Sequence, residues 1–122
     1  LVEVFVEVVH NYPDVLLLIV GDGVERENIA QKIRQLGVEK NIKLEGWTND
    51  PYSYLKTVDC LLFPSLSESY GMVAVEAMAA GCKVIMNNVG VAGFEVTPSE
   101  KVFIVSIGNK EKFKKEIEMV CN

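Results

Sequence analysis

Short apolar runs and longer segments of mixed polarity follow one another along the chain, and this pattern predicts alternating strands and helices. Apolar runs bounded by glycine, proline or polar residues predict strands at residues 15–20, 41–45, 58–63, 84–86 and 102–105. Helical spacing and helix start signals predict helices at residues 25–36, from residue 51, at 71–80 and at 110–120. Strands that alternate with helices in this way indicate an α/β fold with a parallel sheet covered on both faces.

Individual residues mark where several of the predicted helices begin and end. Gly37 stands where a helix C-cap belongs, because glycine readily adopts the left-handed conformation of that position. Asp50 followed by Pro51 is a good helix start, since proline is tolerated in the first turn. Residues 71–80 are apolar nearly all round, interrupted only by Glu76, and we expect that helix to be buried on most sides.

The first eleven residues fit two kinds of structure. Valine at every second position over residues 2–8 favours a strand, by propensity and by alternation. The set Leu1, Phe5, Val8 and Tyr12 fits one face of a helix equally well. Periodicity alone leaves both possibilities open.

The size and charge of the chain narrow the classes of protein that it can represent. Its 122 residues suit one domain, which we place at residues 1–122. The net charge of −5, with no long block of Lys or Arg, argues against indiscriminate binding to nucleic acid. An anionic ligand is still compatible with this charge if the backbone N–H groups of a helix N-terminus supply the positive potential.

Cysteine, histidine and apolar content bear on the cellular setting. The three cysteines are widely spaced and odd in number, which favours reduced thiols in a cytosolic protein over a disulfide framework. A single histidine, His10, argues against a His-based metal site or a Ser-His-Asp triad. No apolar run is long enough to span a bilayer and no signal-peptide pattern is present, so we expect a cytoplasmic protein.

The chemistry is expected beyond the carboxyl ends of the strands, where ligands bind in open α/β sheets. The richest such segment is the polar loop of residues 64–71, which leads into the helix that carries Glu76. The free N–H groups at the start of that helix would suit a diphosphate. Glu68 lies in the loop and Glu76 more than one turn inside the helix, so the two carboxylates reach different parts of one elongated ligand with sugar and ribose hydroxyls.

Glu68, seven intervening residues and Glu76 stand within residues 63–81, and this segment resembles the signature of glycosyltransferase family 4. The similarity extends to residues 12–23, 46–47 and 59–63, and so to nearly the whole chain. It implies the C-terminal, donor-binding half of a GT-B fold: a Rossmann-like, three-layer α/β/α domain with a parallel sheet. It also assigns the first eleven residues to a helix.

The resemblance implies roles for individual residues. Glu68 would contact the donor-sugar hydroxyls and stabilise the charge that develops during transfer, and Glu76 would bind the ribose hydroxyls. Gly21 and Gly23 would line the phosphate side of the cleft, and Trp47 would lie beside the base. The backbone amides that hold the distal phosphate and the sugar would come from Ser69, Tyr70, Gly71, Met72 and Val73.

The resemblance also bears on cofactors and on one further loop. The family needs no metal ion, so the implied ligand is the nucleotide-sugar substrate alone, with no cofactor. Glu95 matches an acidic position of the family. Residues 89–94 depart from the adjacent glycine pair that is usual there.

For the whole protein, the resemblance implies a retaining enzyme that transfers a sugar from UDP-sugar, in preference to GDP-sugar, to a lipid-linked or saccharide acceptor. Bacterial surface polysaccharide biosynthesis, including lipopolysaccharide and O-antigen, is the implied setting. The implied partners are the nucleotide-sugar donor and an N-terminal acceptor-binding domain of the same protein, peripheral to the inner face of the cell membrane. Family members hold the donor pyrophosphate with an Arg and a Lys just before the segment that matches Leu1, and no Lys or Arg precedes Arg26 here. We therefore expect the chain alone to bind the donor weakly and to lack transferase activity.

Other interpretations stay open. Residues 21–23 could form no more than a tight turn, Trp47 could be a partly buried core aromatic, and Glu68 could be a surface carboxylate. For the whole chain, the alternatives are a non-catalytic nucleotide-binding or interaction domain, and a sugar-nucleotide epimerase or phosphorylase of the same fold. The pairing of Glu68 with Glu76 favours the transferase. Glu76 stands on an otherwise apolar helix, where an unpaired charge is unfavourable, so contact with a ligand explains it better than a structural role.

Overall fold

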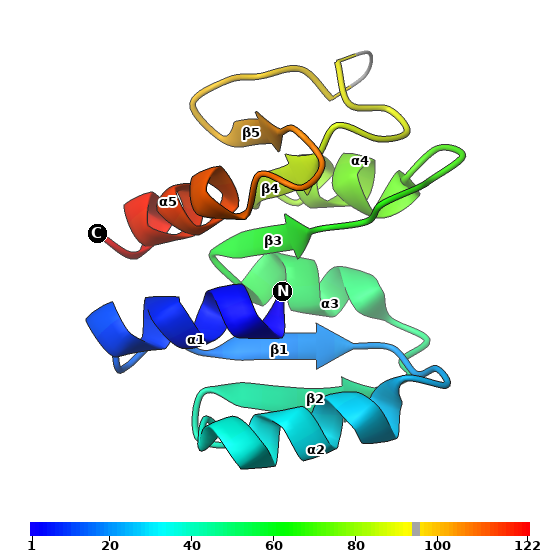
Figure 1. Ribbon diagram of the computed structural model, residues 1–122. Helices are drawn as coiled ribbons and strands as arrows, with labels where there is room; N and C mark the ends of the chain where they lie inside the picture. Colours follow the sequence, from blue (N-terminus) through cyan, green and yellow to red (C-terminus); the bar gives the residue numbers. More distant parts are fainter. Residues whose placement is uncertain (94–95) are drawn as a thin grey trace. The chain divides into compact units, whose positions relative to one another are not determined.

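A computed structural model describes residues 1–93 and 96–122. The chain divides into two compact units, residues 1–49 with Cys121 and residues 50–120 with Asn122. The first unit contains α1 (Val2–Asn11), β1 (Leu17–Val20), α2 (Arg26–Leu36) and β2 (Ile42–Gly46). The second contains α3 (Pro51–Thr57), β3 (Cys60–Phe63), α4 (Met72–Ala79), β4 (Lys83–Asn87), β5 (Val102–Val105) and nearly all of α5 (Lys110–Cys121) (Figure 1).

In the first unit, β1 and β2 form a parallel two-stranded sheet in which Leu17 lies opposite Ile42. The two helices of this unit also contact each other, and the Lys32 ammonium on α2 pairs with the Glu3 carboxylate on α1. α2 ends at Gly37, which takes the left-handed conformation with φ +68°. The predicted C-cap is thereby confirmed.

The ambiguity over the first residues is settled in favour of a helix. Within α1, Val2, Val4, Phe5 and Val8 are buried, at the three- and four-residue spacings of one helical face, whereas Val6 is only half-buried. The alternating valines therefore do not form a strand. Packing of one helical face overrides the β-propensity of valine, which is a weak preference that tertiary contacts commonly outweigh.

In the second unit, β3, β4 and β5 form a parallel sheet with β4 in the middle. The central strand is accordingly the most buried, and Val84, Ile85 and Met86 are inaccessible to solvent. α4 packs on this sheet through Ala74 and Ala77, both fully buried. The predicted start of α3 is confirmed, because Asp50 caps the helix by accepting a hydrogen bond from the Ser53 amide at 3.3 Å.

The expectation that α4 is buried on most sides is wrong. Its buried residues are Ala74 and Ala77, three positions apart, while Met72 and Met78 are 53% and 40% exposed. The small alanine side chains allow close contact with the sheet, and the methionines lie away from that contact. An apolar composition thus did not reveal which sides of the helix have neighbours.

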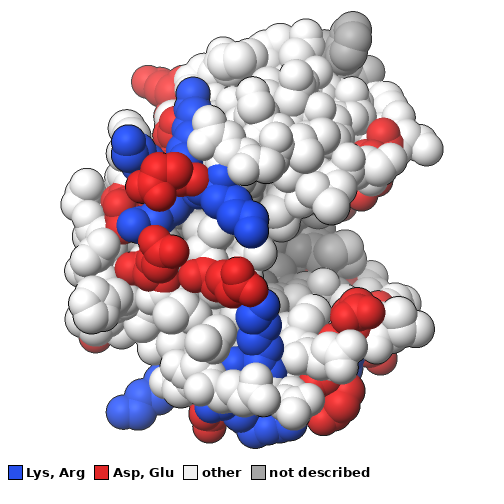
Figure 2. Space-filling model, in the orientation of Figure 1, with Lys and Arg blue, Asp and Glu red and all other residues white. Residues whose placement is uncertain are grey.

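None of the helices in residues 1–93 and 96–122 has the length and apolar character that crossing a lipid bilayer requires. Acidic and basic side chains are interspersed on the face shown in Figure 2, where they form no unbroken basic surface.

Candidate functional site

The loop that carries Glu68 lies at the carboxyl end of the three-stranded sheet. β3 and β4 pair in parallel with Phe63 opposite Met86, so the loop after β3 and the segment after β4 leave the sheet side by side. Among the described residues, hydrogen bonds join this loop to the end of β4 and to the segment after it. The Asn87 side-chain amide donates to the Ser65 carbonyl at 3.1 Å, and the Val91 amide donates to the Tyr70 carbonyl at 2.8 Å.

Glu68 is exposed to solvent, but a hydrogen bond within the loop restrains its side chain. Its Oε1 accepts a hydrogen bond from the Ser65 hydroxyl at 3.1 Å. The other carboxylate oxygen has no partner within the described part of the chain, and so is available to a ligand. Ser69 beside it is also exposed.

The start of α4 leaves backbone donors unused. Its N-cap is Gly71, with φ +91°, and no side chain caps the helix. In the described residues, the non-helical backbone hydrogen bonds do not use the amides of Gly71, Met72 or Val73 as donors. Gly71 is required here because a Cβ would lie 3.2 Å from the Phe63 ring, in a conformation that other residues rarely adopt. These amides are therefore available to an anion, and that they bind one stays a prediction from the sequence.

Glu76 lies one turn inside α4 and is half-buried. Within residues 1–93 and 96–122 its carboxylate has no hydrogen-bond or ion-pair partner, although its oxygens still reach solvent. A partly buried carboxylate without a protein partner is available to ligand hydroxyls. Glu68 and Glu76 thus flank the uncapped amides along the chain, one before the start of α4 and one after it.

The other predicted contacts, Gly21, Gly23 and Trp47, belong to the first unit and follow the carboxyl ends of β1 and β2. The Gly21 amide donates to the Gly46 carbonyl at 2.7 Å, and the Gly23 amide donates to the Asp22 carboxylate at 2.9 Å. Trp47 is 75% exposed, so the alternative that it is a core aromatic is wrong. Glu95 lies outside the described residues.

Arg26 is a candidate contact for an anionic ligand that the sequence analysis did not identify. It is the first residue of α2, and its Nη1 lies 3.5 Å from the position that a Cβ on Gly46 would occupy. It forms no ion pair in the described part of the chain. This places a cation at the carboxyl ends of β1 and β2. Its position in the first turn after the glycines of residues 21–23 is the signal that could have found it.

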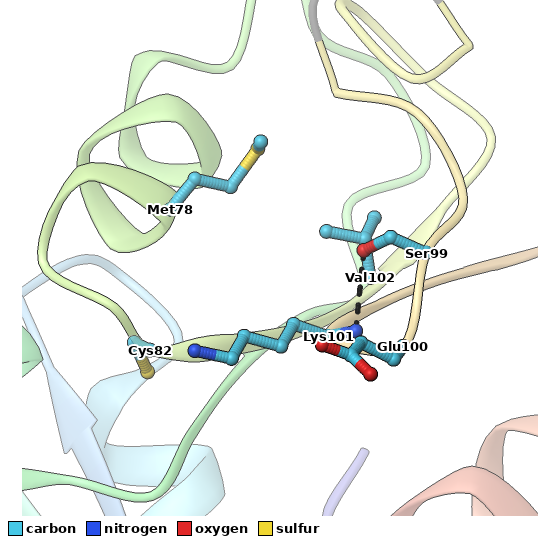
Figure 3. Close-up of a pocket in the computed structure, with 6 residues that line it drawn as sticks. All are labelled: Met78, Cys82, Ser99, Glu100, Lys101 and Val102. Atoms are coloured by element: carbon cyan, nitrogen blue, oxygen red, sulfur yellow. Dashed lines mark hydrogen bonds between the residues drawn. The ribbon is translucent and has the colours of Figure 1, made fainter.

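A pocket of about 220 Å³ lies elsewhere on the second unit, at the amino ends of β4 and β5. Its lining, shown in Figure 3, comprises Met78, Cys82, Ser99, Glu100, Lys101 and Val102. The Lys101 amide donates to the Ser99 hydroxyl oxygen at 3.2 Å (Figure 3). The pocket is at the opposite end of these strands from Glu68, so it is not part of the predicted site.

Cys82 is expected to be the slowest of the three cysteines to react with iodoacetamide in the folded protein. Burial raises the pKa of its thiol, and the Asp59 carboxylate adds a smaller rise, so less of the reactive thiolate is present near neutral pH. Cys60 and Cys121 are only half-buried. Mass spectrometry of the alkylated peptides over time measures the order, and modification of Cys82 at the rate of the other two would contradict the buried environment.

The parallel sheets, the helices between their strands and the polar loops at the carboxyl strand ends define a Rossmann-like, three-layer α/β fold, as the sequence predicted. The chain belongs to the glycosyl transferases group 1 family, whose model matches residues 1–122. It is similar to the lipopolysaccharide core biosynthesis glycosyltransferase LpsE of Rhizobium meliloti, with 31% identity over 115 residues. That match covers 94% of this chain and 34% of LpsE, so the chain spans about a third of the length of this relative.

Two solved structures have the same fold. The C-terminal domain of the glycosyl transferase group 1 family protein LpcC from Francisella tularensis matches with a TM-score of 0.80 and 23% identity, covering 97% of this chain and 65% of that one. HepE of Anabaena, in complex with UDP and glucose, matches with a TM-score of 0.83 and 25% identity, covering 98% of this chain and 33% of that one. The predicted likeness to the C-terminal domain of a GT-B fold is confirmed.

Proposed function

We propose that this chain is the nucleotide-sugar-binding domain of a retaining glycosyltransferase. The observation that carries the proposal is the uncapped start of α4, where the amides of Gly71, Met72 and Val73 stand between two carboxylates with free acceptor oxygens. An activated sugar has the matching groups: a diphosphate for the amides and hydroxyls for the carboxylates. The crystallised complex of HepE with UDP and glucose supports this choice of ligand.

In this proposal each group has a separate task. The α4 amides, with those of Ser69 and Tyr70, hold the distal phosphate and the sugar, and stabilise the negative charge that grows on the diphosphate as the glycosidic bond breaks. Glu68 faces the donor sugar and stabilises the positive charge that develops on its ring. Glu76 accepts hydrogen bonds from the ribose hydroxyls. None of these tasks requires a metal ion.

Three residues of the first unit are proposed donor contacts on their own account. Gly21 and Gly23 would contact a phosphate, and the exposed indole of Trp47 would pack on a base. The whole protein would supply an acceptor-binding domain, N-terminal to this one, and would work on the cytoplasmic side of the cell membrane with a lipid-linked or saccharide acceptor. The similarity to LpsE, whose name refers to lipopolysaccharide core biosynthesis, supports a role in bacterial surface polysaccharides.

The chain is expected to bind UDP with a Kd weaker than about 1 µM, and GDP more weakly, in isothermal titration supported by saturation-transfer NMR. EDTA should leave the affinity unchanged, because the amides rather than a cation hold the diphosphate. Glu76→Gln should weaken binding of UDP about tenfold, since hydrogen bonds to a charged acceptor are lost.

Glu39→Gln is the matched control for Glu76→Gln, because it removes the same charge from an exposed residue of the first unit. It should bind UDP as the unmodified chain does. Binding that disappears with EDTA would contradict the metal-free site. Equal effects of the two substitutions would show that only net charge matters.

A further inference from the structure

Two side chains outside the predicted set lie in series behind Glu68. Asn87 at the end of β4 donates from its side-chain amide to the Ser65 carbonyl at 3.1 Å, and the Ser65 hydroxyl donates to Glu68 Oε1 at 3.1 Å. We propose that Ser65 and Asn87 are positioning residues that set the direction of the Glu68 carboxylate. This inference rests on the proposed function, because it assumes that Glu68 faces the donor sugar.

Asn87 is suited to be the fixed end of this series. It is 6% exposed, and it is the buried polar side chain among the residues that the structure describes. Its backbone is held in the parallel sheet, where it pairs with Val105 of β5. A buried amide must find its hydrogen bonds within the protein, and the Ser65 carbonyl provides one. The side chain therefore cannot turn to water without losing a bond that it needs.

Ser65 transmits this constraint to Glu68. An exposed glutamate on a loop would otherwise sample several rotamers, and choosing one of them costs conformational entropy. The Ser65 hydroxyl restricts that choice because its own backbone is tied to Asn87. It engages Oε1 and leaves the second oxygen for the substrate. The carboxylate is thus oriented before a donor arrives, which is the condition for efficient electrostatic stabilisation.

A second contact holds the loop on the other side of Glu68. The Val91 amide donates to the Tyr70 carbonyl at 2.8 Å, and Gly90 packs so closely on Tyr70 that a Cβ would stand 2.8 Å from the carbonyl carbon and nearer still to the oxygen. The same Cβ would lie 3.4 Å from the Glu68 Cβ. The loop is therefore attached at Ser65 to the end of β4 and at Tyr70 to the segment after it, with Glu68 between the two attachments.

Steady-state kinetics of the full-length transferase test this inference. Ser65→Ala should lower kcat about tenfold, the value of one hydrogen bond to a charged group, with the donor KM changed by less than about twofold. Ser67→Ala, an exposed serine of the same loop without a hydrogen bond among the described residues, is the matched control and should keep the unmodified kcat. In the Glu68→Gln background, Ser65→Ala should cause no further loss, because Ser65 acts through Glu68.

An isosteric pair separates the hydroxyl from packing and remains informative if Ser65→Ala fails to fold. Ser65→Thr keeps the hydroxyl and should keep most of the activity, whereas Ser65→Val should lose as much as Ser65→Ala. Equal activity of the Thr and Val variants would overturn the positioning role, as would additive losses in the double variant. If Glu68→Gln alone leaves kcat unchanged, the proposed function fails instead, so the two failures are distinguishable.

Discussion

Glu68→Gln in the full-length transferase is expected to lower kcat for sugar transfer by about 10²–10³-fold, the usual effect of removing one group that stabilises transition-state charge. The amide has nearly the same shape as the carboxylate, so the fold should be unchanged. In our proposal this removes the negative charge opposite the sugar ring, and the amide cannot replace it. Transfer from UDP-sugar measured as UDP release, together with titration of UDP, gives both effects.

The expected pattern is a large loss of kcat with an unchanged Kd for UDP, because UDP lacks the sugar that Glu68 contacts in our proposal. Glu39→Gln, which removes the same charge from an exposed position, should leave both quantities as they are. Full activity of Glu68→Gln would favour the alternative of a non-catalytic domain. A parallel loss of UDP affinity would instead place Glu68 among the phosphate or ribose contacts.

Gly90→Ala is expected to destabilise the second unit by about 2–4 kcal/mol and to reduce donor binding by more than about tenfold. The glycine has φ +56°, where alanine is strained, and the added Cβ would overlap the backbone carbonyl of Tyr70. A carbonyl in the main chain cannot rotate away as a side chain can. The loop that carries Glu68 must therefore shift.

Gly37→Ala separates these two causes of destabilisation. Gly37 has a similar φ of +68°, but its added Cβ would meet nothing within 4 Å. It should cost only about 1 kcal/mol, from backbone strain alone. Urea unfolding measures both variants, and UDP titration shows whether the site is affected. Equal destabilisation by the two substitutions would mean that the contact between Gly90 and Tyr70 contributes nothing.

Much of the fold could be predicted because local signals agree with the tertiary structure. Apolar runs located β3 and β5, and Gly37 and Asp50 marked helix ends where the structure has them. The signals failed where packing decides. The valines of α1 pointed to a strand and a helix alike, and the exposure of Met72 depends on neighbours that composition does not report.

The candidate site was only partly predictable for a related reason. Glu68 and Glu76 were found because both stand in one contiguous motif, with the helix start between them. Asn87 contacts Ser65 across 22 residues and Gly90 contacts Tyr70 across 20, so both act on the loop from a distant part of the sequence. No periodicity or spacing reports such contacts. Asn87 is the hardest to find, since an asparagine at the end of a strand is ordinarily read as a turn residue.

The left-handed glycine at the head of α4 has a cost for the molecule itself. A serine or aspartate at such a position satisfies the first amides of a helix, and Gly71 forgoes that contribution, which relative to glycine is typically about a few tenths of a kcal/mol. Without a ligand, the start of α4 is therefore less stable than it would be with a capping side chain, but its amides stay free to bind an anion. An anion bound to those amides supplies the missing cap of the helix. Binding of the anion and ordering of the start of α4 therefore increase together.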